Sequence, residues 1–410
     1  MNYKLPALII LTALFLYQML LEIIQYRSAN RPTPDNVKDV YDEETYHKWQ
    51  QYSHEKCRLS ILSTIVSFVI SFVLLLTNAY AAVSALAGHS LYGGAILVML
   101  LNTLASAVVL LPLNYYDTMG IEEKYGFNRS TKKTFFLDQL KEMLLSLMLM
   151  GGLMCLFIAL HQGMGDMVLV LFAVIAFVIV MLIAFLYPVF SKLFNKFTPL
   201  EDAELKEKLI ALLEKNGYKV RDIKVMDASR RSTKSNAYFS GFGKMKTIVL
   251  YDTLLQSSTA DEICAIFAHE MGHGLHKDTL KNQILSFFNI ALLALSLWLL
   301  ARTDAIYPSF GFEGVNYGLC FILMGDVVMA LISPLLSLVT NWHSRRAEYR
   351  ADRQAVEEGY GPGLISGLKK LAKQNFSNLS PHPLLVKLSY SHPPMSQRIA
   401  AIEAEMEKKK

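Results

Sequence analysis

Seven apolar runs dominate this sequence, and each is long enough, or nearly so, to cross a lipid bilayer as a helix. A transmembrane helix needs about 20 predominantly apolar residues to match a hydrocarbon core about 30 Å thick. Only 18% of the residues are charged, against about 25% in soluble proteins. The sequence therefore predicts a mainly α-helical membrane protein. The runs are residues 5–24, 61–82, 95–113, 143–160, 167–190, 285–301 and 317–338.

Lysine and arginine fall on alternate connections between these runs. The connections 25–60 and 114–142 are rich in both residues, whereas 83–94 and 161–166 contain neither, and 302–316 contains only Arg302. The positive-inside rule then places the amino terminus outside and the carboxyl terminus in the cytoplasm. This topology also accounts for the net charge of +5. No basic cluster of the kind that binds nucleic acid is present, so we expect no nucleic-acid partner.

Two polar islands, 191–281 and 341–410, interrupt the apolar pattern. In the first, Thr198 and Glu201 form a capping-box pattern with Pro199 between them, which predicts a helix that ends near 216–217. Two β-like runs follow, and the glycines between them are typical of turns. The runs are 220–226 and 247–251, and the glycines are Gly241 and Gly243.

The stretch AHEMGHGLHKD, residues 268–278, carries the most specific chemistry in the chain. Residues four apart share a helix face, so His269 and His273 can direct both imidazoles at one metal ion, with Glu270 beside them. Zinc lowers the pKa of a bound water to about 7, and a glutamate can accept its proton. The alternative is a chance HExxH pattern on a solvated helix. A second capping box, Thr259 to Glu262, and the expected cytoplasmic position argue against chance, and we predict one zinc ion per chain.

A hydrolytic zinc site uses three protein ligands, and Glu348 is the predicted third. His273 precedes the sixth apolar run by 12 residues, and Glu348 follows the seventh by 10. If both connections are helical, the two residues stand about 18 Å and about 15 Å from the same membrane face. Asp352, one turn further on, is predicted to fix the tautomer of a ligand histidine. The alternative, left open at this point, is an ordinary exposed helix carrying Arg345, Arg346, Arg350 and Arg353.

Five motifs together resemble a known family. HEMGH, RRAEYRAD, SNAYFSGFGK, IEEKYGFNRST and SHPPMSQRI are similar to the motifs of the type I CAAX prenyl endopeptidases, which are integral-membrane zinc proteases. The likeness covers nearly the whole chain, whereas HExxH alone would be weak evidence.

The resemblance implies a fold and a set of roles. The expected fold is a barrel of seven transmembrane helices that encloses a chamber, with a cytoplasmic zincin-type domain containing a small β element. His269, His273 and Glu348 would bind zinc, and Glu270 would be the catalytic base. The expected substrates are prenylated or membrane-associated peptides and proteins, cut near the carboxyl terminus, with membrane lipid as the surrounding partner.

Two further motifs acquire roles through the same resemblance. Asn236, Ala237 and Tyr238 are expected to pair with the substrate backbone as a sheet edge does, the alternative being a plain hairpin. His392 and Arg398 are expected to donate hydrogen bonds to the oxyanion that forms during cleavage. The alternative for His392 is an ordinary loop histidine.

The expected organisation has four parts: 1–190 with the first five membrane helices, 191–283 with the HExxH helix, 284–340 with the last two membrane helices, and 341–410 with the third ligand. Two other functions compete with prenyl proteolysis. One is a broad quality-control protease for membrane proteins, and the other is a non-catalytic channel or chaperone with structural zinc. The expected location is the inner membrane in a bacterial source, which we favour, or the endoplasmic reticulum in a eukaryotic one.

Overall fold

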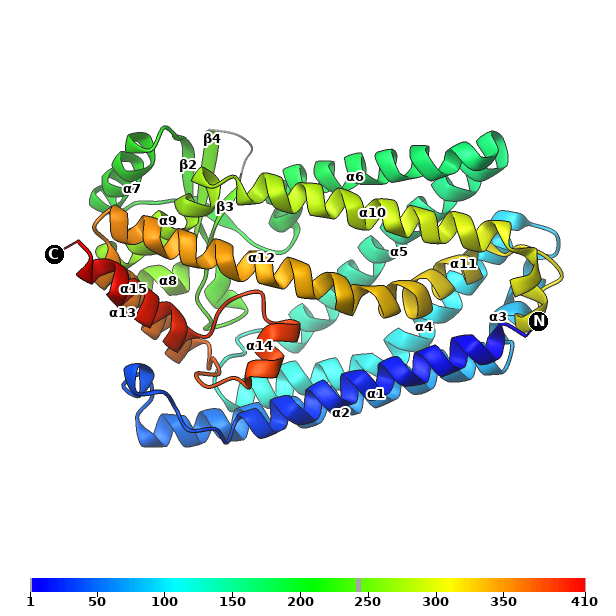
Figure 1. Ribbon diagram of the computed structural model, residues 1–410, viewed down its shortest axis with the longest axis horizontal. Helices are drawn as coiled ribbons and strands as arrows, with labels where there is room; N and C mark the ends of the chain where they lie inside the picture. Colours follow the sequence, from blue (N-terminus) through cyan, green and yellow to red (C-terminus); the bar gives the residue numbers. More distant parts are fainter. Residues whose placement is uncertain (1, 241–244, 410) are drawn as a thin grey trace.

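Long helices form most of the molecule, and they lie side by side along its longest axis (Figure 1). The computed structural model describes residues 2–240 and 245–409. The turn glycines Gly241 and Gly243 lie outside the described residues. The helices of the amino-terminal part are α1 (Lys4–Ser28), α2 (Glu43–Leu76), α3 (Ala79–Ser84), α4 (Leu91–Tyr116), α5 (Lys132–Met164) and α6 (Val168–Phe190).

The carboxyl-terminal half mixes strands with helices before it returns to long helices. Its strands are β1 (Phe197–Pro199), β2 (Lys219–Met226), β3 (Ala237–Ser240) and β4 (Met245–Tyr251). Its helices are α7 (Ala203–Lys215), α8 (Asp252–Ser257), α9 (Ala260–Leu275), α10 (Asp278–Arg302), α11 (Tyr317–Leu323), α12 (Ala330–Glu357), α13 (Gly361–Gln374), α14 (Pro383–Ser389) and α15 (Met395–Glu407).

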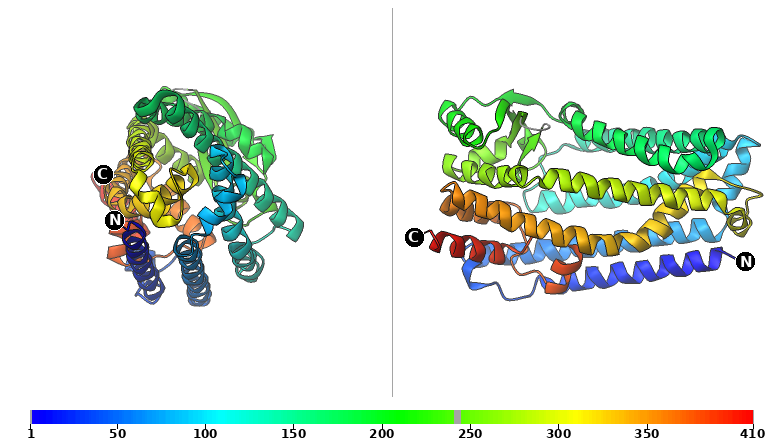
Figure 2. Two further views of the ribbon diagram at one scale, coloured as in Figure 1. Left: turned by 90° about the vertical axis from the view of Figure 1, so that its right-hand side faces the viewer. Right: turned by 45° about the horizontal axis from the view of Figure 1, so that its top comes forward.

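Six helical segments within the described residues are long and apolar enough to cross a membrane. One of them, Lys132–Leu186, contains α5 and most of α6, which are separated by a short 3₁₀ turn and pack against each other. The expected number of seven counts these two helices separately. Viewed end-on, the long helices are arranged around a common axis (Figure 2).

Two of the predicted spans are interrupted. The run 61–82 is not one helix, because Asn78 adopts a left-handed conformation with φ of 58° and separates α2 from α3. The run 317–338 is helical throughout, but a π-helical turn, Met324–Met329, joins α11 to α12. Helix α12 then continues far beyond the apolar run and carries Glu348 and Asp352 out of the membrane part.

The small β element is a four-stranded sheet with the order β1-β2-β4-β3. Strands β2 and β4 are parallel, and the two outer strands are antiparallel to their neighbours. The predicted strands 220–226 and 247–251 are therefore present as β2 and β4. The capping box predicted at Thr198 is wrong, because Phe197–Pro199 is the edge strand β1 and the side chain of Asp202 caps α7 instead.

Two hydrophobic cores correspond to the two parts of the molecule. One joins the membrane helices, and the other packs the sheet against α7, α9 and α13. Ten residues of α9 are buried, including Phe267 and Ala268, so this helix is the centre of the second core. The HExxH motif is therefore carried by a firmly packed helix, in contrast to the solvated helix of the chance alternative.

Candidate metal centre

Helix α9 begins as the sequence predicts. The side chain of Thr259 accepts a hydrogen bond from the Glu262 amide, and the Glu262 carboxylate accepts one from the Thr259 amide at 2.8 Å. This capping box satisfies two amides that have no partner inside the helix. It fixes the start of α9, and therefore the direction in which His269 and His273 point.

The connection between the motif and the next membrane helix is interrupted at His276 and Lys277, whereas the distance estimate from the sequence assumed one continuous helix. Helix α9 ends at Leu275, and Lys277 adopts a left-handed conformation with φ of 57° before α10 begins at Asp278. The chain therefore changes direction just after His273. On the other side the expectation holds, because α12 runs without interruption past Glu348.

His269, His273 and Glu348 come together where α9 packs against α12. Nε2 of His273 lies 3.3 Å from Oε1 of Glu348, and Nε2 of His269 lies 3.5 Å from Oε2 of the same carboxylate. One candidate ligand atom from each residue lies within 4.8 Å of the other two. Two imidazoles and a carboxylate are the ligands that zinc takes in hydrolytic sites.

The carboxylate of Glu348 has an atom that a metal would satisfy. Its Oε2 is buried and receives no hydrogen bond from the described residues, although Nη1 of Arg398 is 3.2 Å away. Glu348 itself is only 4% exposed. Because a buried anion without full compensation is costly, this donor set fits a divalent cation.

Each imidazole has a carboxylate on its other nitrogen. Nδ1 of His269 lies 2.9 Å from Oδ1 of Asp352, as the sequence predicts for that residue. Nδ1 of His273 lies 3.3 Å from Oδ2 of Asp278, which the sequence analysis did not identify. Such contacts favour the tautomer that leaves Nε2 free to bind a metal.

Arg398 is held inside the site by two carboxylates. Its guanidinium donates to Asp352 at 2.6 and 2.9 Å and lies 3.2 Å from Glu348. Burial alone would lower the pKa of Arg398, but the Asp352 and Glu348 charges raise it, so the side chain stays charged. Its hydrogen bonds to Asp352 and its ion pair with Glu348 position both carboxylates, and the expected donation from Arg398 to the oxyanion stays a prediction.

His392 occupies a different environment. Its side chain is 64% exposed, and its Nε2 lies 3.4 Å from Oε1 of Glu348. It lies between α14 and α15, and its Nδ1 is 2.9 Å from the Ser391 hydroxyl. His392 is therefore at the open side of the candidate metal centre, where a substrate could reach it.

Glu270 follows His269 on α9 and is partly exposed. Burial by itself would lower the pKa of His273, but the Glu348 hydrogen bond and the charges of Glu348 and Glu270 raise it. Glu270 is therefore close enough to the His273 imidazole to act on it electrostatically. A carboxylate in this position can accept a proton from a water bound at the centre.

The residues predicted to bind substrate lie at the edge of the sheet. Ala237 and Tyr238 begin β3, which pairs with β4 on one side and is the last strand in the sheet order. Asn236 directly precedes the strand, and its backbone carbonyl accepts a hydrogen bond from the Tyr251 amide at 3.1 Å. An edge strand of this kind can add an extended peptide by backbone pairing.

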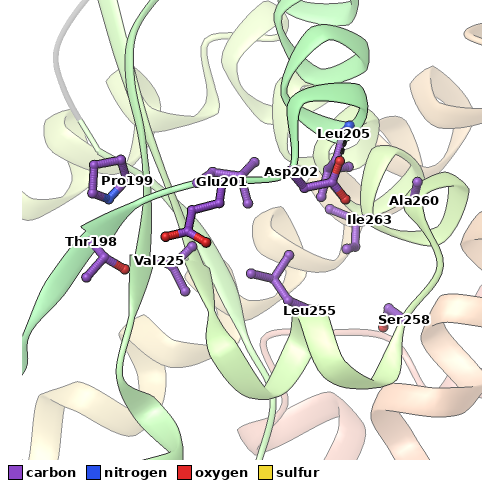
Figure 3. Close-up of a pocket in the computed structure, with 11 residues that line it drawn as sticks. Thr198, Pro199, Glu201, Asp202, Leu205, Val225, Leu255, Ser258, Ala260 and Ile263 are labelled. Atoms are coloured by element: carbon purple, nitrogen blue, oxygen red, sulfur yellow. Dashed lines mark hydrogen bonds between the residues drawn. The ribbon is translucent and has the colours of Figure 1, made fainter.

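Two hollows formed by described residues are lined by residues other than those of the metal centre. One of about 390 Å³ lies at the start of α7 and α9, where Glu201 and Asp202 border apolar side chains such as Leu255 and Ile263 (Figure 3). Another, of about 480 Å³, is an apolar groove between α2 and α4.

Two family models match the chain. The model described as CAAX prenyl protease N-terminal, five membrane helices, matches residues 22–196, and that of peptidase family M48 matches residues 199–406. The match therefore extends from α1 into α15.

Individual proteins are similar over almost their full length. The chain is 32% identical to CAAX prenyl protease 1 of Saccharomyces cerevisiae, covering 97% of this chain and 94% of that protein. It is also 32% identical to the CAAX prenyl protease 1 homolog of Oryza sativa subsp. japonica, over 97% and 96% of the two chains. The crystal structure of S. mikatae Ste24p superposes with a TM-score of 0.91 at 31% identity, covering 98% of this chain and 99% of that one. The chain therefore belongs to peptidase family M48, and it is an integral-membrane zinc metalloendopeptidase.

Proposed function

We propose that this endopeptidase cleaves peptide bonds near the carboxyl terminus of prenylated CAAX-type substrates. The observation that carries the proposal is a zinc-type ligand set on α9 and α12, next to Glu270, in a chain similar over nearly its whole length to proteins named CAAX prenyl protease 1. A lipid-modified peptide resides at the bilayer, which explains why the site is attached to long apolar helices.

Each residue of the candidate metal centre has a separate proposed role. His269, His273 and Glu348 would hold one zinc ion, and the chemistry that a bound zinc would supply is activation of a water molecule and polarisation of the scissile carbonyl. Glu270 accepts the proton of that water and passes it to the leaving amine. Asp352 and Asp278 hold the two imidazoles, and Arg398 positions Asp352 and Glu348. His392 donates to the oxygen that becomes negative as the carbonyl is attacked.

The substrate is held as an added strand. The extended peptide pairs through its backbone with the edge formed by Asn236, Ala237 and Tyr238. Recognition at this edge therefore depends on the extended conformation of the peptide and not on its sequence. The prenyl group remains in an apolar environment, either in lipid or within a chamber enclosed by seven membrane helices.

The proposed topology has the amino terminus outside and the metal centre in the cytoplasm. Arginine and lysine are concentrated in the connections on the side of the metal centre, which supports this orientation. The membrane is the inner membrane in a bacterial source and the endoplasmic reticulum in a eukaryotic one. We propose the same organisation in four parts as the sequence indicates, with the boundaries 1–190, 191–283, 284–340 and 341–410.

Cleavage assays on detergent-purified protein test the function. We expect a farnesylated CAAX peptide to be cut, the same peptide without farnesyl to be cut at least tenfold more slowly, and both activities to be lost with a zinc chelator. Glu270→Gln should abolish cleavage while the zinc content stays at one per chain, whereas Glu204→Gln, an exposed glutamate on α7, should be fully active.

Two outcomes contradict the proposal. Equal or faster cleavage of an unfolded membrane protein, with no preference for the farnesylated peptide, would favour a quality-control protease. Full activity of the Glu270→Gln variant would contradict the zinc mechanism, in which Glu270 accepts the proton of the attacking water.

A further inference from the structure

The position of His392 depends on its backbone, because its exposed side chain has few contacts. Its Nδ1 lies 2.9 Å from the Ser391 hydroxyl, and its Nε2 lies 3.4 Å from Oε1 of Glu348. Ser391 is the neighbouring residue in the chain and moves with it. The distance from His392 to Glu348 is therefore set by the contacts that hold residues 390–394, the segment between α14 and α15.

The chain on both sides of His392 is short and stiff. Helix α14 ends at Ser389, and α15 begins at Met395. Pro393 and Pro394 follow His392 directly. A proline fixes its own φ and restricts the residue before it to extended conformations. A displacement of the end of α14 would therefore displace His392 as well.

Arg345 on α12 holds the end of α14. Its Nη1 donates to the Tyr390 carbonyl at 2.6 Å and to the Val386 carbonyl at 2.9 Å. The last carbonyls of a helix have no partner within the helix, and a cation beside them also interacts favourably with the helix dipole. Helix α14 lies beside α12 along this contact (Figure 1). Arg345 therefore fixes a carbonyl only two residues before His392.

The neighbouring contacts of α14 are longer. Nδ2 of Asn341, which precedes Arg345 by one turn of α12, donates to the Leu388 carbonyl at 3.2 Å. The Tyr390 hydroxyl donates to Oε1 of Gln25 on α1 at 3.4 Å. Because the two contacts of Arg345 are shorter and come from a charged donor, they should contribute most to holding this segment.

The helix that carries Arg345 also carries Glu348. The two residues are three apart on α12, which is unbroken between them, so they lie on one face of a rigid element. The carboxylate of the candidate metal centre and the donor that holds the His392 segment are therefore fixed relative to each other. The 3.4 Å separation of His392 from Glu348 follows from this arrangement.

We propose that Arg345 is a positioning residue of the peptidase reaction, which acts through the Tyr390 carbonyl to hold His392 at the candidate metal centre. This inference rests on the proposed function, in which His392 donates to the oxygen that becomes negative as the carbonyl is attacked. It adds a residue that acts only through another side chain. Misplacing such a donor by about 1 Å can cost about 100-fold in rate.

Steady-state cleavage by single variants is the first test, with the peptide that the wild type cleaves fastest, farnesylated or not. Arg345→Met keeps most of the side-chain length but removes the donors, and it should lower kcat by about tenfold to 100-fold with KM and zinc content nearly unchanged. Arg345→Lys should restore part of the loss, because an ammonium group can still donate to a carbonyl. Arg346→Gln is the matched control, since Arg346 is exposed and lies over the Trp342 ring, and it should be fully active.

A double variant separates positioning from a general structural role. If Arg345 acts through His392, Arg345→Met should lower kcat little further in a His392→Ala protein. A residue with a merely structural role would lower kcat by the same factor in both backgrounds. Hydrogen exchange of residues 386–394, followed by mass spectrometry on the zinc-loaded, full-length protein, needs no cleavage. Exchange should be faster in Arg345→Met and unchanged in Arg346→Gln.

The proposal is overturned if Arg345→Met lowers kcat equally in both backgrounds, if exchange of residues 386–394 is unchanged in the folded variant, or if loss of zinc accounts for the lower kcat. The proposed function fails by a different result. It is contradicted when the wild type shows no preference for the farnesylated peptide, whatever the Arg345 variants do, so the two failures are distinguishable.

Discussion

The two histidines of the candidate metal centre, His269 and His273, contact carboxylates that come from different places in the chain. Asp352 lies on α12 beside Glu348, whereas Asp278 is the first residue of α10, five residues after His273. Asp278 is also held by Arg350 at 2.7 Å and by Lys281 at 3.1 Å. Asp278 is therefore a fixed acceptor for the His273 ring, and its replacement should weaken metal binding.

We predict that Asp278→Asn weakens zinc binding by about 10-fold to 100-fold, as is usual when an outer partner of a ligand histidine is changed. Competition with a chelator of known affinity measures this. Asp261→Asn, a change of an exposed aspartate on α9, should leave zinc affinity unchanged. Wild-type affinity in Asp278→Asn would show that the contact does not position His273.

His392 and Arg398 should respond differently to substitution. His392 is exposed at the open side of the site, so His392→Ala should lower kcat by about 10²-fold, with zinc content and KM nearly unchanged. Arg398 is buried between two carboxylates, so Arg398→Lys should lower zinc affinity and the melting temperature together. Steady-state kinetics with zinc analysis separates the two roles, and loss of zinc in His392→Ala would contradict this assignment.

These residues show what spacing can and cannot predict. Asp352 could be predicted because it lies one turn from Glu348 on a single helix. Asp278 could not, because a continuous helix would carry it away from His273, and only the left-handed Lys277 returns the chain to the ring. The ion pair of Arg398 with Asp352 joins residues 46 apart in sequence and depends entirely on tertiary packing.

At the scale of elements, the close approach of α9 and α12 brings the candidate metal ligands His269, His273 and Glu348 together. Gly272 lies at the contact, where a methyl group added to it would lie 2.8 Å from Cα of Ala351. This is too close for carbon atoms, and the obstacle is backbone, so one helix would have to move. The glycine of HEMGH is therefore required by packing rather than by turn geometry.

We predict that Gly272→Ala destabilises the protein by about 1 to 3 kcal/mol and separates Glu348 from the histidines. Thermal unfolding and zinc content measure the two effects. Gly152→Ala adds the same methyl group to α5 at a position with no atom within 4 Å and should be neutral. Normal zinc content in Gly272→Ala would contradict a tight α9–α12 contact.

Glu262 links the start of α9 to α13, and its contribution to stability depends on pH. Burial would raise the pKa of Glu262, but hydrogen bonds from Lys370 at 2.7 Å and from Ser366, with the Thr259 amide, lower it below its ordinary value of 4.5. A carboxyl whose pKa is lowered by folding stabilises the fold above its unfolded pKa, and that stability is lost as the pH falls through the folded value.

Glu262→Gln should therefore cost about 1 to 3 kcal/mol at pH 7. The difference from wild type should shrink below pH 4.5, where the wild-type carboxyl itself becomes protonated. Melting temperatures of both proteins between pH 7 and pH 3.5 test this. A difference that stays constant over this range would show that the ion pair with Lys370 does not contribute.

The two capping-box patterns, at Thr259 and at Thr198, show which helix boundaries could be predicted from the sequence. The Thr259 capping box precedes a long buried helix, and local chemistry and tertiary packing agree there. At Thr198 the same pattern is present, but Pro199 fits an edge strand equally well, and pairing with β2 decides the outcome. The start of α7 at Ala203, four residues after Pro199, therefore reflects competition between two local possibilities.

For the whole molecule, apolar run length predicted that the chain has long apolar helices, because it reflects bilayer thickness directly, and six candidate spans are present within the described residues. It could not predict how the segment between α1 and α2 packs. Tyr41 of that segment donates to the Ala372 carbonyl of α13 at 2.9 Å, and Trp49 in the first turns of α2 donates to the Phe376 carbonyl just after α13 at 3.0 Å. These contacts join residues more than 300 apart, and no local pattern signals them.

The central claim is that one zinc ion is shared by α9 and α12. A crystal structure of the purified protein, with diffraction data collected on both sides of the zinc absorption edge, tests it most directly. We predict a single anomalous peak about 2.0 to 2.2 Å from Nε2 of His269, Nε2 of His273 and a carboxylate oxygen of Glu348. A zinc peak at another place, or one bound by the histidines with Glu348 turned away, would contradict it.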